Sequence, residues 1–237
     1  MRVLVIIPAF NEAEAIAQVI QDIPRGLVTE VVVVNNASTD ATEKNASKAG
    51  ATVLHESRRG YGYACLRGLA YASSRNPDVI VFLDGDYSDH SDEMSTLVAP
   101  IQAGTHDLVI GSRIKGVSEQ GALLPQARWG NRLACFLMRL FWGARYSDLG
   151  PFRAIRYQSL MELHMRDATF GWTIEMQIKA HIAGLRITEI PVSYRRRVGV
   201  SKITGSLIGA AKASVKILGI IFRFAIISRH LRRRLAA

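Results

Sequence analysis

Short apolar runs alternate with amphipathic stretches along the first half of the chain. The runs are rich in β-branched residues, as expected for strands buried on both faces of a parallel sheet. Asn11 is expected to cap a helix over residues 12–22. We expect strands at residues 2–7, 30–35, 52–55, 79–83 and 107–110. This alternation predicts an α/β fold with a mostly parallel, Rossmann-like, doubly wound sheet.

The rhythm changes after residue 113. Pro125 can open a helix that runs to about Trp142, and Arg128, Arg132 and Arg139 would share one face of it. This basic face is either a contact surface for an anionic partner or an ordinary solvated face. A last strand is expected at residues 186–192.

Residues 201–237 are predicted to form a separate basic segment after a domain of residues 1–200. Lys212, Lys216 and Arg223 fall on one helical stripe, and Ile221 lies on another. No run reaches the roughly 18–20 uncharged apolar residues of a spanning helix. The pattern predicts amphipathic helices in the membrane interface, with the basic residues at anionic head groups. A packed C-terminal helix or a dimer face is the alternative.

Polar or glycine residues end most of the expected strands, and parallel strands bring such ends to one edge of the sheet. Asp84, Gly85 and Asp86 follow the run at 79–83. Two carboxylates around a glycine can turn toward one space, which suits Mg²⁺ or Mn²⁺. The tripeptide alone also fits a simple polar turn. Gly60 and Gly62 do not follow the first strand, which excludes the dinucleotide-binding signature.

Charge adds a second constraint. The chain of 237 residues has a formal net charge of +10, with arginines crowded after residues 127 and 194. Nucleic acid, a membrane surface or a phosphorylated substrate would satisfy this charge, but no aromatic-interleaved basic platform favours nucleic acid. The two cysteines lack metal-ligand spacing, and the first apolar run is too short for a signal peptide. We therefore expect a cytoplasmic location.

Eight motifs in order give a more specific signal than any of them alone. They are IIPAFNE (6–12), VVNNASTD (33–40), RGYGYACLRG (59–68), VFLDGDYSD (81–89), LVIGSR (108–113), SDLGPFRAI (147–155), FGWTIEMQIKA (170–180) and YRRRVGVSKITG (194–205). With them the chain resembles family 2 glycosyltransferases of the GT-A fold, close to the dolichyl- or polyprenyl-phosphate mannosyl- and glucosyltransferase branch.

The resemblance implies where a nucleotide-sugar donor binds. Asp84 and Asp86 match the metal-binding DxD element of the family. Asn36 stands where many members have aspartate, and its amide could pair with uracil or guanine, so the base stays open. The residues expected around the donor are Pro8, Asn11, Glu12, Asn36, Asp40, Gly62, Asp84 and Gly85.

The expected chemistry is electrostatic, because a departing diphosphate gains negative charge. Besides Asp86, the cations Arg113, Arg197 and Lys202 are the expected catalytic groups around phosphates. Asp148 would act as general base for a hydroxyl acceptor, or it holds an arginine or caps a turn. An acceptor phosphate is already anionic near neutral pH and needs no base.

These observations lead to one expectation and two alternatives. We expect an inverting, metal-dependent transfer of a hexose from GDP-mannose or UDP-glucose to polyprenyl or dolichyl phosphate, at the cytoplasmic face of a membrane. One alternative keeps the donor but uses a sugar or glycolipid hydroxyl. The other is a non-catalytic basic membrane-binding protein, which would have no use for Asp84 and Asp86.

Overall fold

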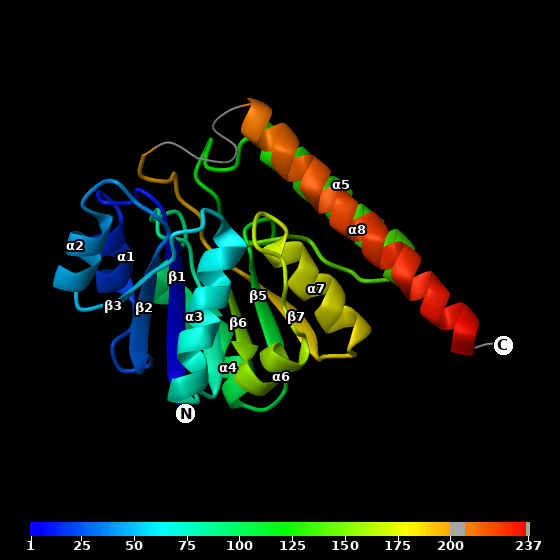
Figure 1. The fold of residues 1–237 in the computed structure, drawn as a ribbon, viewed down its shortest axis with the longest axis horizontal. Coiled ribbons are helices and arrows are strands. Elements are labelled where there is room, and N and C mark those ends of the chain that lie inside the picture. The colour runs from blue at the N-terminus through cyan, green and yellow to red at the C-terminus, as the bar shows by residue number, and fades with distance from the viewer. Residues whose placement is uncertain (200–206, 236–237) are drawn as a thin grey trace.

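Seven strands form one sheet with helices on both of its faces (Figure 1). The computed structural model describes residues 1–199 and 207–235. The strands are β1 (Val3–Ala9), β2 (Glu30–Asn35), β3 (Thr52–His55), β4 (Val79–Phe82), β5 (Leu108–Ser112), β6 (Arg153–Arg156) and β7 (Ile187–Pro191). Their order is β3-β2-β1-β4-β6-β5-β7. Strand β6 runs antiparallel to both neighbours, and the other pairs are parallel. The predicted mostly parallel sheet is confirmed.

The central strands are buried on both faces, as their continuous apolar runs predict. In β1 and β4, Val5 and Val81 face the layer of α1 and α4, whereas Ile6 and Phe82 face α3 and α7. Alternate side chains of a strand point to opposite faces, so both layers share the same strands. The helices are α1 (Ile16–Asp22), α2 (Thr42–Lys48), α3 (Tyr61–Arg75), α4 (Met94–Gln102), α5 (Pro125–Trp142), α6 (Tyr157–Glu162), α7 (Trp172–Ile182) and α8 (Leu207–Leu235), with a 3₁₀ turn at Ser91–Glu93.

The first loop differs from its prediction. Strand β1 continues through Pro8, which pairs with Val34, and α1 begins only at Ile16. Asn11 does not cap this helix, so that prediction was wrong. Its backbone is left-handed, with φ of 55°, and its Oδ1 accepts a hydrogen bond from the Thr39 amide at 2.8 Å. The side chain therefore joins the loop after β1 to the loop after β2.

The described part of the C-terminal segment, residues 207–235, forms the helix α8, which lies along α5 (Figure 1). Ile220 and Ile221 are buried in a cluster with Met138 of α5 and Ile174 and Ile178 of α7. This packing matches the alternative given for the segment and leaves its outer side exposed. Within the described residues, no helix is long and apolar enough to span a membrane. A functional division at residue 200 stays a prediction.

Candidate active site

A cavity of about 560 Å³ opens at the carboxyl ends of the central strands. Its charged side chains come from the strand-end loops and include Asp84, Asp86, Arg113 and Arg197. Its apolar side chains come from α8, from the residues just before α5 and α7, and from the turn at residue 149. They include Leu123, Leu124, Leu149, Phe170, Ala213 and Ile217. The cavity therefore combines an ionic part with a hydrophobic part.

Asp84 and Asp86 meet in the ionic part, as their spacing predicts. Asp84 Oδ1 is buried without a hydrogen-bond partner among the described residues, and burial together with the charge of Asp86 raises the pKa of Asp84 to about 7. Asp86 Oδ1 accepts from the Ser88 amide at 3.0 Å. Gly85 lies between them against Ile7 and Ile16. An unsatisfied carboxylate oxygen beside a second carboxylate fits a hard divalent cation.

Protein side chains alone would not complete a metal shell here. No group of three or more His, Cys, Asp or Glu side chains in the described ranges is arranged to hold a metal ion. A cation at Asp84 and Asp86 would therefore need further oxygen ligands, which a diphosphate supplies.

Arg197 links two of the predicted donor motifs. Its Nη1 lies 3.0 Å from Asp86 Oδ2, and its Nη2 lies 3.1 Å from Glu12 Oε1. The Val198 amide also donates to the Asp86 carbonyl oxygen at 2.9 Å. The structure thus brings Glu12, Asp86 and Arg197 together from three distant parts of the chain. Lys202 lies outside the described residues.

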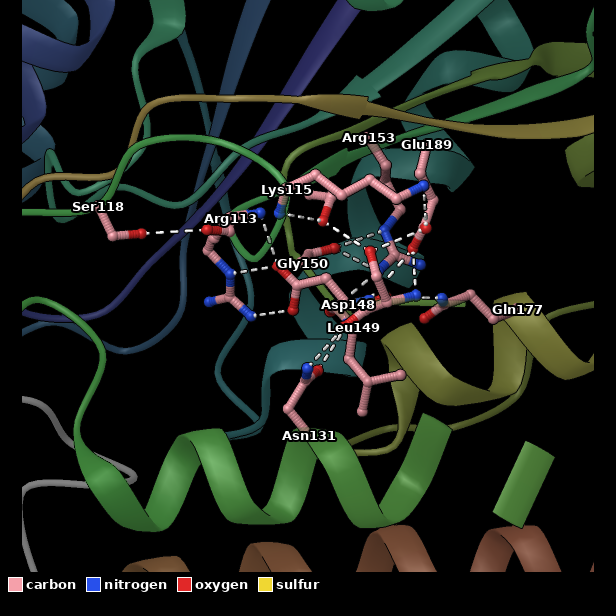
Figure 2. A network of polar contacts seen from close by, with 12 residues as sticks. Arg113, Lys115, Ser118, Asn131, Asp148, Leu149, Gly150, Arg153, Gln177 and Glu189 are labelled. Atoms are coloured by element: carbon pink, nitrogen blue, oxygen red, sulfur yellow. Dashed lines mark hydrogen bonds and ion pairs between the residues drawn. The ribbon is translucent and has the colours of Figure 1, made fainter. Parts of the chain in front are cut away.

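Arg113 is held by Asp148 in a two-pronged ion pair (Figure 2). Asp148 Oδ2 accepts from the Arg113 amide and from Nε, and Oδ1 accepts from Nη2, each at 2.8 Å. Burial alone would lower the pKa of Arg113, but the charge and hydrogen bonds of Asp148 outweigh it and raise the pKa. Asp148 is also fully buried. Of the roles expected for it, the geometry supports that of holding an arginine.

Asn36 shapes a loop instead of presenting a free amide. Its Nδ2 donates to the carbonyl oxygens of Glu56 and Arg58, and its Oδ1 accepts from the Gly60 amide at 2.7 Å. Hydrogen bonds from Arg58 hold the pKa of Glu56 at about 2. The amide expected to read the base is therefore occupied by residues 56–60.

The remaining donor candidates mostly hold the loops together. Asp40 accepts from the Thr42 amide at 2.9 Å and from the Ala13 amide at 3.2 Å. Burial alone would raise the pKa of Asp40, but a hydrogen bond from the Thr42 hydroxyl and those from the two amides outweigh it and lower the pKa. Gly62 lies against the backbone of Asp167, whose carbonyl oxygen would be 2.0 Å from any added Cβ. Pro8 is buried inside β1.

The motif analysis missed two polar side chains beside the carboxylates. The Tyr61 hydroxyl is buried, lines the cavity and has no hydrogen-bond partner in the part of the chain that the structure describes. Asp89 is buried, and burial with the charge of Asp84 raises its pKa. Both lie inside quoted motifs, but strand-end spacing singled out the first two carboxylates only.

Comparison with known proteins decides the family. The sequence matches Glycosyl transferase family 2 over residues 4–163. The chain belongs to this family. This glycosyltransferase is 34% identical over 211 residues to an uncharacterised glycosyltransferase of Mycobacterium tuberculosis, covering 88% of the chain and 92% of the relative. It is 33% identical over 225 residues to the dolichyl-phosphate hexose transferase of Haloferax volcanii, covering 90% and 92%.

The fold is shared with solved glycosyltransferases. The glucosyl-3-phosphoglycerate synthase of Mycobacterium tuberculosis, solved with phosphoglyceric acid, superposes with a TM-score of 0.74 at 25% identity. The match covers 96% of this chain and 79% of the synthase. The resemblance to a GT-A glycosyltransferase is confirmed, and the protein is an enzyme of that class.

Proposed function

We propose that this glycosyltransferase moves a hexose from a nucleotide diphosphate sugar, such as GDP-mannose or UDP-glucose, to polyprenyl or dolichyl phosphate. The observation that carries the proposal is the double character of the cavity, which is ionic at the strand ends and apolar toward α5, α7 and α8. An acceptor with a phosphate head and an isoprenoid chain has the same two parts. The relative that uses dolichyl phosphate supports this acceptor class.

Asp84 and Asp86 are the residues that would hold Mg²⁺ or Mn²⁺ with the donor diphosphate. The ion, when bound, would neutralise the charge that develops on the departing diphosphate. The unsatisfied Asp84 Oδ1 supports this role, because a buried carboxylate oxygen without a partner is costly until a cation meets it.

The transfer is a single displacement that inverts the sugar carbon. An acceptor phosphate oxygen forms the new bond to that carbon while the bond to the diphosphate oxygen breaks. Arg113 and Arg197 line the cavity and would stabilise phosphate charge on either side of the sugar. Lys202 stays a prediction as a further phosphate contact.

The acids of the cavity favour a phosphate acceptor over a hydroxyl. A hydroxyl must lose a proton to a base, whereas a phosphate monoester is already anionic above its second pKa of about 6. Asp84 and Asp86 are the carboxylates among the described lining residues, and the metal would occupy them. Asp148 is already bound to Arg113.

We also propose that α5 and α8 rest on an anionic membrane surface. Trp129 is 72% exposed and Phe136 is 60% exposed on α5, and Val215 is 71% exposed on α8. Basic side chains flank these apolar ones, which suits the head-group boundary of a lipid leaflet better than nucleic acid. The apolar stripe comprises Trp129, Leu133, Phe136 and Leu140 of α5 and Val215, Phe222 and Ile226 of α8. The flanking cations comprise Arg128, Arg132, Arg139 and Arg223, whereas Lys216 pairs with Asp167.

This orientation would put the enzyme at the cytoplasmic face of a membrane as a peripheral protein. Phe136→Glu with Leu140→Glu should weaken sedimentation with phosphatidylglycerol vesicles at least about tenfold, because two buried anions replace apolar contacts. Met161→Glu, at an exposed apolar position on α6, is the matched control and should bind as wild type. Equal sedimentation of all three proteins would contradict the orientation.

The transfer itself is tested with radiolabelled GDP-mannose and UDP-glucose, with Mg²⁺ or Mn²⁺ and with a choice of acceptors. Label that enters the organic phase only with polyprenyl phosphate and metal would support the proposal and name the donor. Label transferred to a glycolipid hydroxyl, or to a soluble phosphorylated acid, in place of polyprenyl phosphate would overturn the proposed acceptor.

A further inference from the structure

The turn at residues 147–149 carries Asp148 and is held by a side chain that no motif singled out. The side chain of Glu189, in β7, is only 5% exposed. Its Oε1 accepts from the backbone amides of Ser147 at 2.8 Å and Asp148 at 3.1 Å (Figure 2). Its Oε2 accepts from the Ser147 hydroxyl at 2.8 Å and pairs with Lys115 Nζ at 2.9 Å.

Two helices hold the same turn from the other side. Asn131 of α5 donates to the Ser147 carbonyl oxygen at 2.9 Å and accepts from the Leu149 amide at 2.8 Å. Gln177 of α7 donates to the Asp148 carbonyl oxygen at 3.0 Å. The backbone around Asp148 is therefore fixed by β7, α5 and α7 together.

The position of this turn sets the position of Arg113. Both carboxylate oxygens of Asp148 bind the Arg113 guanidinium, and a two-pronged pair of this kind fixes direction as well as distance. Arg113 in turn lines the cavity. A displacement of the turn would therefore displace the guanidinium from the phosphate it is expected to meet.

We propose that Glu189 is a positioning residue for glycosyl transfer, acting through the Ser147–Asp148 backbone and Asp148 to aim Arg113 into the cavity. This inference rests on the proposed function, because it assumes that Arg113 meets a phosphate. A buried ionic side chain is an inefficient source of stability, since an apolar residue of similar size often serves as well. The acceptor oxygens of Glu189 instead fix one backbone arrangement.

The test compares two substitutions at this position. Glu189→Ala removes every contact to the turn, and we expect kcat to fall about 10- to 100-fold, the usual range for a lost supporting contact. Glu189→Gln keeps an oxygen for the two backbone amides and should stay within about fivefold of wild type by the same reasoning. Lys115→Met removes only the ion pair and should stay within about threefold. A loss in Lys115→Met as large as in Glu189→Ala would overturn the proposal.

A double-mutant cycle separates positioning from general stability. If Glu189 acts through Arg113, Glu189→Ala should lower kcat less than about threefold in an Arg113→Met background. An equal loss in both backgrounds would overturn the proposal. If Glu189→Ala does not fold, as judged by circular dichroism and a thermal melt, Ser147→Ala takes its place in the cycle because it removes one contact to Glu189.

The readout keeps this inference separate from the acceptor assignment. The cycle is measured as release of UDP or GDP from UDP-glucose or GDP-mannose, with and without polyprenyl phosphate. Nucleotide release without lipid acceptor still reports on Arg113 when the lipid-phosphate proposal fails. If Glu189→Ala and Arg113→Met are non-additive in nucleotide release but no lipid product forms, the acceptor assignment is refuted. If lipid product forms but the two substitutions are additive, the role of Glu189 is refuted.

Discussion

Asp84 lines the cavity, Asp148 holds the Arg113 that lines it, and the oxygens of the two aspartates differ in their partners. Asp148 gives both oxygens to Arg113, while Asp84 Oδ1 is buried with no partner among the described residues. A saturated carboxylate belongs to the framework, whereas an unsatisfied one beside Asp86 is ready for a ligand. The partners of these two aspartates therefore separate them. Asp86 lies between the two cases, because its Oδ1 accepts from Ser88 and its Oδ2 would have to exchange Arg197 for the cation.

The largest expected effect is on turnover, when the carboxylate pair of Asp84 and Asp86 is broken. Asp86→Ala should lower kcat by at least about 10³-fold, because the leaving diphosphate loses its cation. The fold should persist, since Arg197 keeps Glu12 as a partner. Transfer assays beside circular dichroism check this. Activity close to wild type would show that Asp86 holds no essential metal.

For the ion pair between Asp148 and Arg113, the main expected effect is on stability. Asp148→Asn should reduce the free energy of unfolding by about 3–5 kcal/mol, because the Arg113 cation loses its charged partner. Urea denaturation measures the change, and the surface substitution Met161→Glu serves as the control. Unchanged stability would contradict the framework role of the Asp148–Arg113 pair, whereas a loss of activity alone would not, because Asp148 also aims Arg113.

A smaller effect on stability is expected at Asn36, which was predicted to read the base but holds a loop in the structure. Asn36→Ala should cost about 1–3 kcal/mol of stability, because it leaves the buried backbone groups of residues 56–60 without partners. The preference between UDP and GDP sugars should stay unchanged. Competition between the two labelled donors checks this, and a changed preference would restore Asn36 as a base-reading residue.

The smallest expected effect is the pH dependence of Asp84 in metal-free protein. Its folded pKa of about 7 lies above the ordinary value, so the folded state binds more protons between about pH 4 and 7. Stability from this group is present at low pH and is lost as pH rises toward 7. Asp84→Asn should therefore raise Tm at pH 8 in EDTA, by about 2–4 °C for each kcal/mol of this cost that it removes, but not at pH 4. An equal shift in Tm at pH 8 and at pH 4 would contradict a raised pKa for Asp84.

Local pattern was enough for the parallel strands and for helix α5, but not for the direction of β6, which runs antiparallel between β4 and β5. Continuous apolar runs predicted the central strands, and Pro125 with helical spacing predicted α5 at the bounds observed, Pro125–Trp142. The start of α1 was missed because Asn11 uses its side chain across two loops, which no local capping pattern records. The C-terminal segment was predicted as surface helices, but its contacts with α5 and α7 depend on the tertiary arrangement.

The sequence predicted which residues belong to the site better than it predicted which of them are in contact. Spacing singled out Asp84 and Asp86, and the family resemblance pointed to Glu12 and Arg197. Their meeting depends on parallel strand ends that are distant in sequence. Glu189 was missed because it lies within a strand, where nothing local shows that it supports a turn more than 40 residues earlier.

Mn²⁺ binding in the presence of UDP or GDP separates the two aspartates most directly. Isothermal titration would compare wild type, Asp84→Asn and Asp148→Asn under conditions where all three are folded. Asp84→Asn should lose Mn²⁺ affinity by at least about tenfold, while Asp148→Asn should keep affinity within about threefold, because of these two aspartates only Asp84 has an oxygen without a partner among the described residues. Unchanged Mn²⁺ affinity in Asp84→Asn, with a loss of affinity in Asp148→Asn, would contradict the account. Asp84 would then not be the metal ligand, and Asp148 would not be limited to holding Arg113.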